Sequence, residues 1–450
     1  MLKLKSYRMT MDFYKYLFML NQSKGIGLII NLFIFLVSLI TLVYNNRNFV
    51  NAMNDFNLIM LFLVGYSLFN ATWSMIEKYK EIQEFIGKNK LIEMTTKTNL
   101  VKDEFVFQLD KINSEKRGNW LFENFSPDST SENRVVRSED LNNYLWDYDF
   151  ELKKDDGTRE KKIKKFIIKN REIITPFFQY KYYNSKRKNQ NFFNETKLCM
   201  SSDINPKRSY VSCHKSNYYN SFLTNEISTS VLKRIEDATI IYDASNFYPC
   251  EYNRAEDKYY LQSIDKSEMN NHIGASTLAV TDDNYLVIRK QGAGTQQNIN
   301  KYVPTGSGSC NWSDIKEGSF RSTIEYSMKR ELWEENGGRN HKSGIDEFAE
   351  TKLLGYFRWL KRGGKPEFVG ISKLNCSLDQ LTPDHNELID MNSKADTDTF
   401  YLESVDDLPK VIKEIKQIGN TSLPLLMSLD ALKQFYQHRR DELDQLLKLG

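Results

Sequence analysis

Two long runs without charged residues constrain the fold of this chain most. Residues 25–46 contain 22 consecutive uncharged residues, and residues 56–76 form a second run, "FNLIMLFLVGYSLFNATWSMI". At about 1.5 Å per residue, a helix over either run covers the roughly 30 Å of a bilayer's hydrocarbon core. The sequence therefore predicts an N-terminal two-helix transmembrane hairpin, closed by a periplasmic loop at 47–55.

Basic residues set the predicted direction of this hairpin. The joining loop holds only Arg47 among its basic residues, whereas several others precede the first run or follow the second: Lys3, Lys5, Arg8, Lys15, Lys24, Lys78, Lys80, Lys88 and Lys90. Cytoplasmic flanks of membrane helices carry the excess of Lys and Arg. We therefore expect residues 1–24 and everything from residue 77 onward to be cytoplasmic.

Polar residues recur on one face of each predicted span. They are Asn31 and Ser38 in the first span, and Ser67, Asn70 and Ser74 in the second. One interpretation is polar contact within or between hairpins. The other is that several hairpins assemble with these faces lining a leak, because a polar stripe in lipid is costly unless it meets polar partners or water.

The overall charge and the cysteines exclude little. A net charge of +3 makes no electrostatic case for a nucleic acid or lipid partner, and we expect neither DNA nor RNA. The five cysteines form no CxxC pair that could seed a zinc site: Cys199, Cys213, Cys250, Cys310 and Cys376. We interpret them as free thiols in a reducing compartment.

Residues 77–228 are predicted to be a cytoplasmic stalk followed by a connecting region. Basic clusters such as "REKKIKK" and "YKYYNSKRK" are interleaved with aromatic residues between 159 and 208. Basic groups can hold phosphates while aromatic rings stack on bases. They can equally contact anionic lipid headgroups, or form a solvated basic face over an ordinary aromatic core.

Local patterns become clearer beyond residue 271. "ASTLAV", "TDDN" and "YLVIRKQ" predict a strand hairpin, and "VPTGSGS" predicts a glycine-rich turn. Apolar residues at helical spacing predict a helix that begins near 318 and stops at Gly337. A second hairpin is expected over 353–374 and a last helix over 424–447, packed on the sheet.

Three carboxylates converge on the predicted helix near 318. Glu331, Glu334 and Glu335 stand at i, i+3 and i+4 in "RELWEENG". Hard oxygen donors of this kind suit Mg²⁺ or Mn²⁺, which would then bridge to phosphate oxygens. The alternative for this spacing alone is a solvated acidic face.

"RELWEENG" also resembles the second half of the Nudix box, with Arg330, Glu331, Leu332, Glu334, Glu335 and Gly337 in matching places. The resemblance implies a Nudix-like α/β/α sandwich over 229–450, with its core from about 271. It also implies a metal on the three glutamates, Arg330 orienting the helix, and a catalytic role for these four residues if the domain is a hydrolase.

The chain departs from the first half of that box. Ser322 stands where the family has Glu, Lys316 where it has Gly, and Gly338 replaces the closing aliphatic residue. Glu325 lies one turn after Ser322 as a partial substitute, and Gly318 is displaced by two residues. These departures favour binding over turnover.

Candidate nucleotide contacts surround this helix. Arg289 and Lys290 end a strand facing the glycine-rich turn that contains Thr305 and Gly306. The two basic residues could meet phosphate charge or could be ordinary edge residues.

The whole layout, a two-helix hairpin followed by a Nudix-like domain, resembles the membrane effectors of bacterial cyclic-oligonucleotide antiphage signalling (CBASS). The resemblance implies an inner-membrane protein whose Nudix-like domain senses a cyclic nucleotide. Its hairpins would then form homo-oligomers in contact with membrane lipids and disrupt the bilayer. The competing interpretation is an anchored Mg²⁺-dependent hydrolase of nucleoside diphosphate derivatives.

Overall fold

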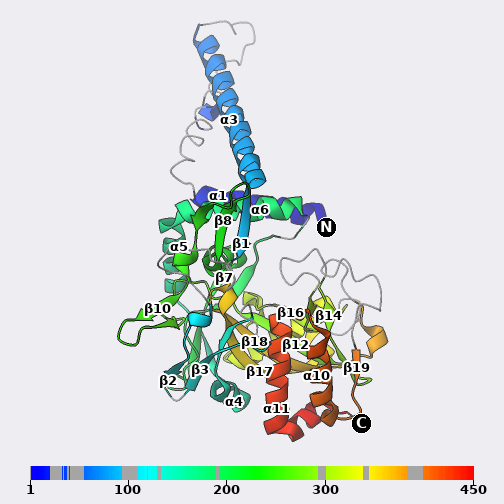
Figure 1. Cartoon of the computed structure of the whole chain (residues 1–450). Coiled ribbons are helices and arrows are strands. Elements are labelled where there is room, and N and C mark those ends of the chain that lie inside the picture. Colours follow the sequence, from blue (N-terminus) through cyan, green and yellow to red (C-terminus); the bar gives the residue numbers. More distant parts are fainter. Residues whose placement is uncertain are drawn as a thin grey trace. The chain divides into compact units, whose positions relative to one another are not determined.

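The computed structural model describes residues 2–20, 33, 35–37, 40, 55–93, 109–118, 120–128, 133–188, 190, 192–291, 301–337, 344–382 and 399–449 (Figure 1). The chain divides into two compact units. Unit 1 comprises Met1–Leu91, Ile168–Asn184 and Leu232–Tyr242, and unit 2 comprises Ile92–Ile167, Ser185–Val231 and Asp243–Gly450.

Unit 1 combines long helices with a small sheet. Its elements are α1 (Leu2–Leu20), α3 (Asp55–Lys88), most of α6 (Arg171–Arg187), and the strands β1 (Asn89–Glu93), β8 (Ser230–Arg234) and β9 (Ile240–Asp243) in the order β1-β8-β9. Helix α1 packs on α6 through Phe13, whose ring stacks on Tyr182 with centroids 3.6 Å apart and planes 4° apart. The aromatic residues of α6 therefore serve the core of this unit.

The predicted transmembrane hairpin is wrong. The second predicted span, 56–76, does fall within helix α3, but no helix among the described residues is long and apolar enough to cross a bilayer. Polar side chains such as Asn70 and Ser74 interrupt the apolar run of α3, and charged residues follow from Glu77. The first predicted span, 25–46, and the loop at 47–55 lie almost entirely outside the described residues. The same finding contradicts the predicted location in a bacterial inner membrane.

A mixed sheet forms the centre of unit 2. Eight of its nine described strands run in the order β19-β13-β12-β18-β17-β4-β3-β2, and β16 pairs with β12 off this path. Their bounds are β2 (Glu115–Arg117), β3 (Trp120–Phe125), β4 (Val135–Arg137), β12 (Gly274–Val280), β13 (Tyr285–Val287), β16 (Gly306–Ser309), β17 (Ala349–Trp359), β18 (Lys365–Leu374) and β19 (Thr399–Tyr401). The central pair β12 and β18 is parallel, and the other described pairings of this sheet are antiparallel.

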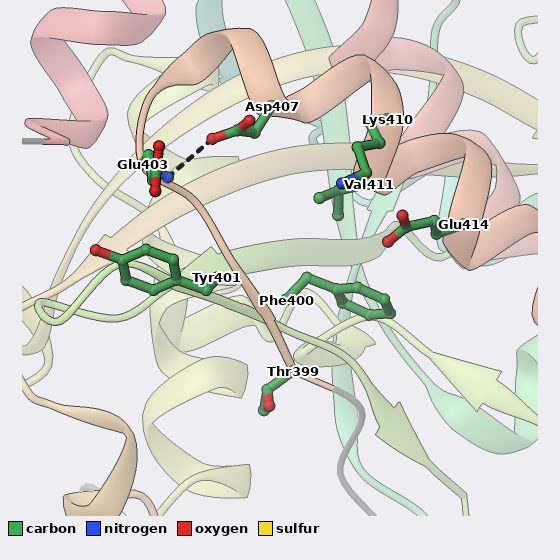
Figure 2. Close-up of a pocket in the computed structure, with 8 residues that line it drawn as sticks. All are labelled: Thr399, Phe400, Tyr401, Glu403, Asp407, Lys410, Val411 and Glu414. Atoms are coloured by element: carbon green, nitrogen blue, oxygen red, sulfur yellow. Dashed lines mark hydrogen bonds between the residues drawn. The ribbon is translucent and has the colours of Figure 1, made fainter.

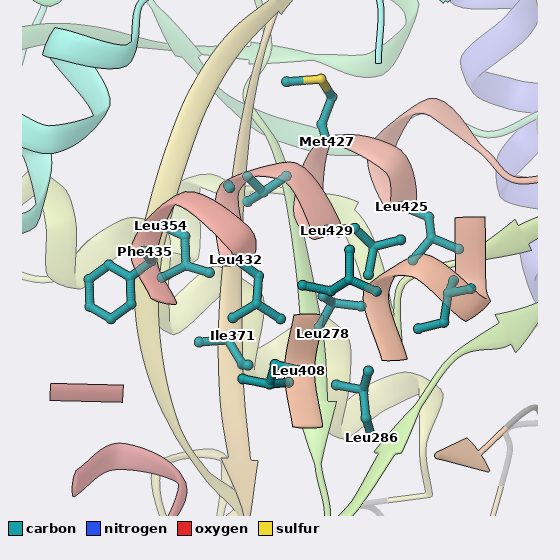
Figure 3. Close-up of a cluster of buried hydrophobic side chains, with 14 of the residues drawn as sticks. Leu278, Leu286, Leu354, Ile371, Leu408, Leu425, Met427, Leu429, Leu432 and Phe435 are labelled. Carbon is teal, nitrogen blue, oxygen red and sulfur yellow. The ribbon is translucent and has the colours of Figure 1, made fainter. Parts of the chain in front are cut away.

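Helices cover both faces of this sheet, because successive side chains of the central strand β12 pack against different helices. Leu278 and Val280 of β12 join a buried cluster with helices α10 (Leu408–Ile418) and α11 (Leu423–Leu447), as Figure 3 shows for Leu278. Ala279, between them, joins a second cluster with Leu332 of helix α8 (Phe320–Glu335). Since successive strand residues point to opposite faces, α8 lies on one face and α10 and α11 lie on the other.

Several local predictions are confirmed. The first hairpin forms with Ala279 opposite Val287. The second joins β17 to β18 through Gly363 and Gly364, whose φ angles of +58° and +66° suit glycine. The predicted final helix forms as α11 and packs on the sheet.

The remaining described elements of unit 2 surround this sheet. They are α4 (Glu139–Asp147), α5 (Thr158–Lys169), α7 (Tyr218–Ser221), α9 (Ile345–Phe348), β5 (Glu151–Lys154), β6 (Thr196–Met200), β7 (Tyr210–Asn217), β10 (Cys250–Asn253), β11 (Lys258–Leu261), β14 (Arg289–Lys290) and β15 (Tyr302–Val303). Unit 2 also contains short helical turns, of which η3 is a π-helix and the others are 3-10 helices: η2 (Leu109–Lys111), η3 (Phe222–Glu226), η4 (Ile227–Thr229), η5 (Ser245–Phe247), η6 (Trp312–Asp314), η7 (Leu360–Arg362), η8 (Leu378–Gln380) and η10 (Val405–Asp407). The five cysteines are free thiols, as expected.

Candidate functional site

Helix α8 carries the glutamate motif and forms as its pattern predicts. Ser319 caps its N-terminus by accepting a hydrogen bond from the backbone N–H of Ser322. The helix ends before Gly337, whose φ of +79° only glycine adopts readily. Its apolar stripe is buried: Phe320, Ile324, Met328 and Leu332.

Two glycines let strand β16 approach this helix closely. A methyl group on Gly306 would lie 2.8 Å from the Cα of Leu332, and one on Gly308 would lie 2.1 Å from the carboxyl carbon of Glu331. Both distances are shorter than non-bonded carbon atoms allow. The glycine-rich turn predicted to approach a ligand thus approaches helix α8.

Glu331 and Glu335 hold the backbone of β16. Glu331 Oε1 accepts a hydrogen bond from the N–H of Ser309 at 3.1 Å, and Glu335 Oε2 accepts one from the N–H of Ser307 at 3.0 Å. The spacings match, because four helical residues rise about 6 Å and two strand residues rise about 6.6 Å. The two carboxylates therefore satisfy N–H groups that the pairing of β16 with β12 does not use.

Arg330 gathers the other acidic groups. Its guanidinium contacts Asp314 through Nε and Nη2, Glu331 through Nη2 at 2.9 Å, and Glu334 through Nη1 at 3.0 Å. Nη2 also donates to the carbonyl oxygen of Ser309 at 2.9 Å. Arg330 thus holds four partners at once: Asp314, Glu331, Glu334 and the carbonyl group of Ser309.

The electrostatics keep this arginine charged. Burial lowers the pKa of Arg330, but Glu331, Asp314 and Glu334 raise it by more, so the net shift is upward. Burial raises the pKa of Glu331, while Arg330 and Lys197 act in the opposite direction. Lys197 comes from strand β6, and its Nζ donates to Asn311 at 3.0 Å.

Glu325 does not replace the missing first glutamate of the motif. Its Oε1 accepts a hydrogen bond from the N–H of Leu353 at 3.0 Å, at the β-bulge between Leu353 and Gly355. Burial raises its pKa. Ser322, which stands at the position of that glutamate, is exposed. The role of Glu325 is to satisfy an N–H beside the bulge.

The motif has the right donor chemistry for a hard cation but is committed to other contacts. Glu331 and Glu335 each give an oxygen to a β16 N–H, and Glu334 pairs with Arg330. Within the described part of the chain, no three Asp, Glu, His or Cys side chains are grouped as metal ligands. Glu331, Glu334 and Glu335 are thus engaged within the protein, and the predicted Mg²⁺ or Mn²⁺ site on them stays a prediction.

The predicted nucleotide contacts lie around the end of α8. Asn336 joins two of them, since its Oδ1 accepts from Arg289 and its Nδ2 donates to the carbonyl oxygen of Thr305 at 2.9 Å. Arg289 is buried, which lowers its pKa to about 10. Lys290 is half-buried, with its Nζ 5.9 Å from the ring centre of Tyr302. The structure thus brings Arg289 and Thr305 together with Gly306, and Arg289 points into the protein.

Sequence reasoning missed two residues of this network, Asp314 and Asn336. Asp314 closes a capping box with Asn311, a signal that "NWSD" carries in the sequence. Asn336 directly follows the glutamates and ends the helix. Asp314 lies outside the motif, and Asn336 fills a position of the motif to which the resemblance assigns no residue type.

Ser67, Asn70 and Ser74 all lie on helix α3, so their i, i+3 and i+7 spacing places them on one helical face. Ser67 is buried, Asn70 is half-buried and Ser74 is exposed. Asn31 and Ser38 lie outside the described residues.

A cavity of about 490 Å³ lies between the edge strand β19 and helix α10 (Figure 2). Its lining includes three carboxylates and one cation: Glu403, Asp407, Glu414 and Lys410. The N–H of Glu403 donates to Asp407 Oδ2 at 2.8 Å. Acidic lining disfavours a phosphate ligand, so this cavity is not a candidate nucleotide site.

No family model matches the chain, and no curated protein matches it. Among solved structures, it is similar to DR0079 from Deinococcus radiodurans, with 12% identity, 35% of this chain and 81% of that chain covered, and a TM-score of 0.24. It is also similar to a MutT protein from Methanosarcina mazei Go1, with 11% identity, 36% and 93% covered, and a TM-score of 0.24. At TM-scores of 0.24, neither similarity assigns a family to this chain, and the antiphage effector family is not confirmed.

Proposed function

We propose that the Nudix-like part of unit 2 binds a nucleotide and turns it over slowly or not at all. The ligand that fits the sequence resemblance is a cyclic nucleotide second messenger of a bacterial antiphage system. In this role the domain is a sensor, and binding shifts the population of its conformations.

One observation carries the preference for binding over turnover. The carboxylates of "RELWEENG" are engaged within the protein, because Glu331 and Glu335 hold β16 and Arg330 holds Glu334. A hydrolase of this type needs carboxylates that hold a metal and position water. Ser322 removes a further carboxylate at the start of the helix.

The alternative is a Mg²⁺-dependent hydrolase of nucleoside diphosphate derivatives. The i, i+3 and i+4 spacing of Glu331, Glu334 and Glu335 on the last two turns of α8 favours it. Metal binding through Glu335 Oε2 would exchange the N–H of Ser307 for a metal ion, at the cost of one backbone hydrogen bond.

Binding and turnover should be measured on the same full-length protein. Calorimetry with a panel of cyclic dinucleotides and trinucleotides tests binding, and formation of the nucleoside monophosphate from nucleoside diphosphate derivatives with Mg²⁺ tests turnover. We expect one cyclic nucleotide to bind and no Mg²⁺-dependent formation of a nucleoside monophosphate.

The matched variants are Glu335→Gln and Glu317→Gln, the latter at an exposed position before the helix. Mg²⁺-dependent formation of the nucleoside monophosphate that is lost in Glu335→Gln and kept in Glu317→Gln would establish the hydrolase instead. A protein that neither binds nor hydrolyses any nucleotide offered refutes both functions.

A further inference from the structure

A second cavity, of about 330 Å³, lies between helix α5 and the segment from 246 to 269. We propose that it binds a small planar aromatic ring bearing an anionic group, such as a nucleoside monophosphate. None of the glutamate-motif residues lines it, so the inference does not rest on the proposed function. Its volume falls in the range of small-ligand pockets, about 300–1,000 Å³, and suits one nucleotide better than a strand.

Aromatic and apolar side chains form one side of this cavity. Phe166 of α5 meets Phe247 edge to face, with ring centroids 5.2 Å apart and planes at 78°. Tyr248 and Met269, both buried, also line it. The Tyr248 hydroxyl donates to the carbonyl oxygen of Leu360 at 2.9 Å, so its polar group is satisfied inside the protein. Such a wall offers stacking and dispersion contacts to a planar ring.

The cavity also carries excess positive charge. Two cations, Lys162 and Lys266, line it together with one carboxylate, Glu268. The Lys162 Nζ donates to the carbonyl oxygen of Lys266 at 2.8 Å. Burial, and then the neighbouring Arg159, lower the pKa of Lys162, and Glu268 opposes them. Lys266 has Glu251 as an exposed partner at 3.3 Å. An anion beside Lys162 would offset the repulsion from Arg159.

Arg159 holds the loop that forms the far wall. It is 5% exposed, and its two terminal nitrogens donate to the carbonyl oxygens of Asp265 and Met269, both at 3.2 Å. Its Nε has no hydrogen-bond partner among the described residues. A buried guanidinium with an unused donor adds to the positive potential behind the cavity.

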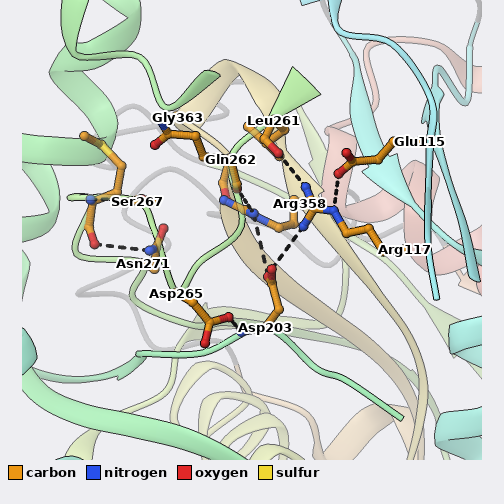
Figure 4. Close-up of polar contacts among 12 residues, drawn as sticks. Glu115, Arg117, Asp203, Leu261, Gln262, Asp265, Ser267, Asn271, Arg358 and Gly363 are labelled. Carbon is orange, nitrogen blue, oxygen red and sulfur yellow. Dashed lines mark hydrogen bonds and ion pairs between the residues drawn. The ribbon is translucent and has the colours of Figure 1, made fainter. Parts of the chain in front are cut away.

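The adjoining strand segment is fixed before any ligand arrives. Figure 4 shows Arg358 and Arg117 reaching the backbone of Gln262 and Leu261. Arg358 Nη1 donates to the carbonyl oxygen of Gln262 at 2.8 Å, and Gln262 itself lines the cavity. Little ordering would be required on binding, which favours affinity.

This cavity accounts for part of the basic and aromatic pattern noted between 159 and 208. Lys162 and Phe166 stand at i and i+4 on α5, so one helical face presents a cation and a ring together. Most other aromatic residues of that stretch are buried, including Phe177, Tyr182 and Phe192. The interpretation that basic groups hold a phosphate while aromatic rings stack on a base thus applies to Lys162 and Phe166 of this cavity.

Calorimetry on the full-length protein tests the inference with four probes: adenosine monophosphate, adenosine, salicylate and inorganic phosphate. We expect adenosine monophosphate or salicylate to bind, which distinguishes a nucleotide from an aromatic carboxylate. Inorganic phosphate should bind at least tenfold more weakly, because it lacks the ring. Equal binding of inorganic phosphate, or no binding of either aromatic anion, overturns the proposal.

Variants locate the binding. Lys162→Gln should weaken the aromatic anion about tenfold through loss of a charge-assisted contact and leave adenosine within about twofold. Lys165→Gln, on the exposed side of the same helix, should change neither. Phe247→Leu should weaken the anion and adenosine alike, by about tenfold. Binding that resists Lys162→Gln and Phe247→Leu but is lost in Glu335→Gln would place the ligand at helix α8 and overturn the proposal.

Discussion

Arg330 and Asp314 form a two-point ion pair, with Nε 2.9 Å from Oδ1 and Nη2 3.0 Å from Oδ2. The two side chains are 9% and 1% exposed. Asp314 Oδ2 also accepts a hydrogen bond from Ser327 Oγ at 2.9 Å. This residue outside the motif therefore fixes the arginine that organises the motif.

Asp314→Asn should destabilise unit 2 by about 2–4 kcal/mol, because it removes one partner of a buried ion pair whose other charge remains. Urea unfolding monitored by tryptophan fluorescence measures the change. Asp346→Asn is the control, since Asp346 is 64% exposed in its ion pair with Lys329 and should matter by less than about 1 kcal/mol. Equal effects of the two variants would contradict the role given to Asp314.

Gly306→Ala should lower the free energy of unfolding by about 1–3 kcal/mol. The new methyl group would lie only 2.8 Å from the Cα of Leu332. Gly344→Ala is the control, since nothing lies within 4 Å of a methyl group there. Thermal unfolding of both variants gives the comparison. If Gly306→Ala retains full stability but loses nucleotide binding, Gly306 serves the ligand and not the packing of β16.

Glu325 provides a test of buried charge. Its pKa is raised by burial, so the stability it contributes is complete below the unfolded-state pKa and is lost as pH rises through the folded-state value. Glu325→Gln keeps an acceptor for the N–H of Leu353, and we expect unchanged or higher stability at pH 7. Glu325→Leu should cost about 1–3 kcal/mol by leaving that N–H unpaired. A large loss in Glu325→Gln would show that the charge itself is needed.

His214 should make the fold sensitive to acid. Burial, and then Arg159, lower its pKa to about 4, and its Nδ1 lies 2.9 Å from Ser201 Oγ. Because the unfolded chain takes up the proton first, stability is present above about pH 6.5 and falls as pH drops toward 4. Between pH 7 and pH 5 this amounts to about 2 kcal/mol.

Urea unfolding at both pH values should show that His214→Gln reduces the pH dependence by this amount. Gln437→Asn, which replaces an exposed side chain without a titratable group, is the control and should leave the pH dependence unchanged. Identical pH dependence in wild type and His214→Gln would contradict the prediction.

Residue spacing in the sequence predicted the helices and hairpins that form from neighbouring residues. Helix α8 and the hairpin of β17 and β18 follow from residue spacing and from glycines at positive φ. Asp314 reaches Arg330 only through the tertiary fold, and no spacing rule connects residues 16 apart in a turn and a helix. The glutamates were assigned to a metal because their convergence is visible in sequence, whereas the N–H groups of β16 that they bind are not.

The transmembrane prediction failed for a different reason. A count of uncharged residues treats Asn70 and Ser74 as equivalent to leucine, although amide and hydroxyl groups are costly to place in lipid. The strands β2, β3 and β4 went unnoticed because they are short and lie in a stretch without regular apolar periods. The strand that pairs with β4 on its other side, β17, lies far along the chain.

The pairing of β4 with β17 has a consequence for how the protein is made. Phe357 lies opposite Arg137, so 220 residues separate partners in one sheet. At about 5–20 residues per second, a ribosome needs roughly 10–45 s to deliver the second partner. During that interval β4 has been made but β17 has not, so the backbone N–H and C=O groups on one edge of β4 have no strand partner. We expect nascent chains halted before residue 349 to depend on chaperones.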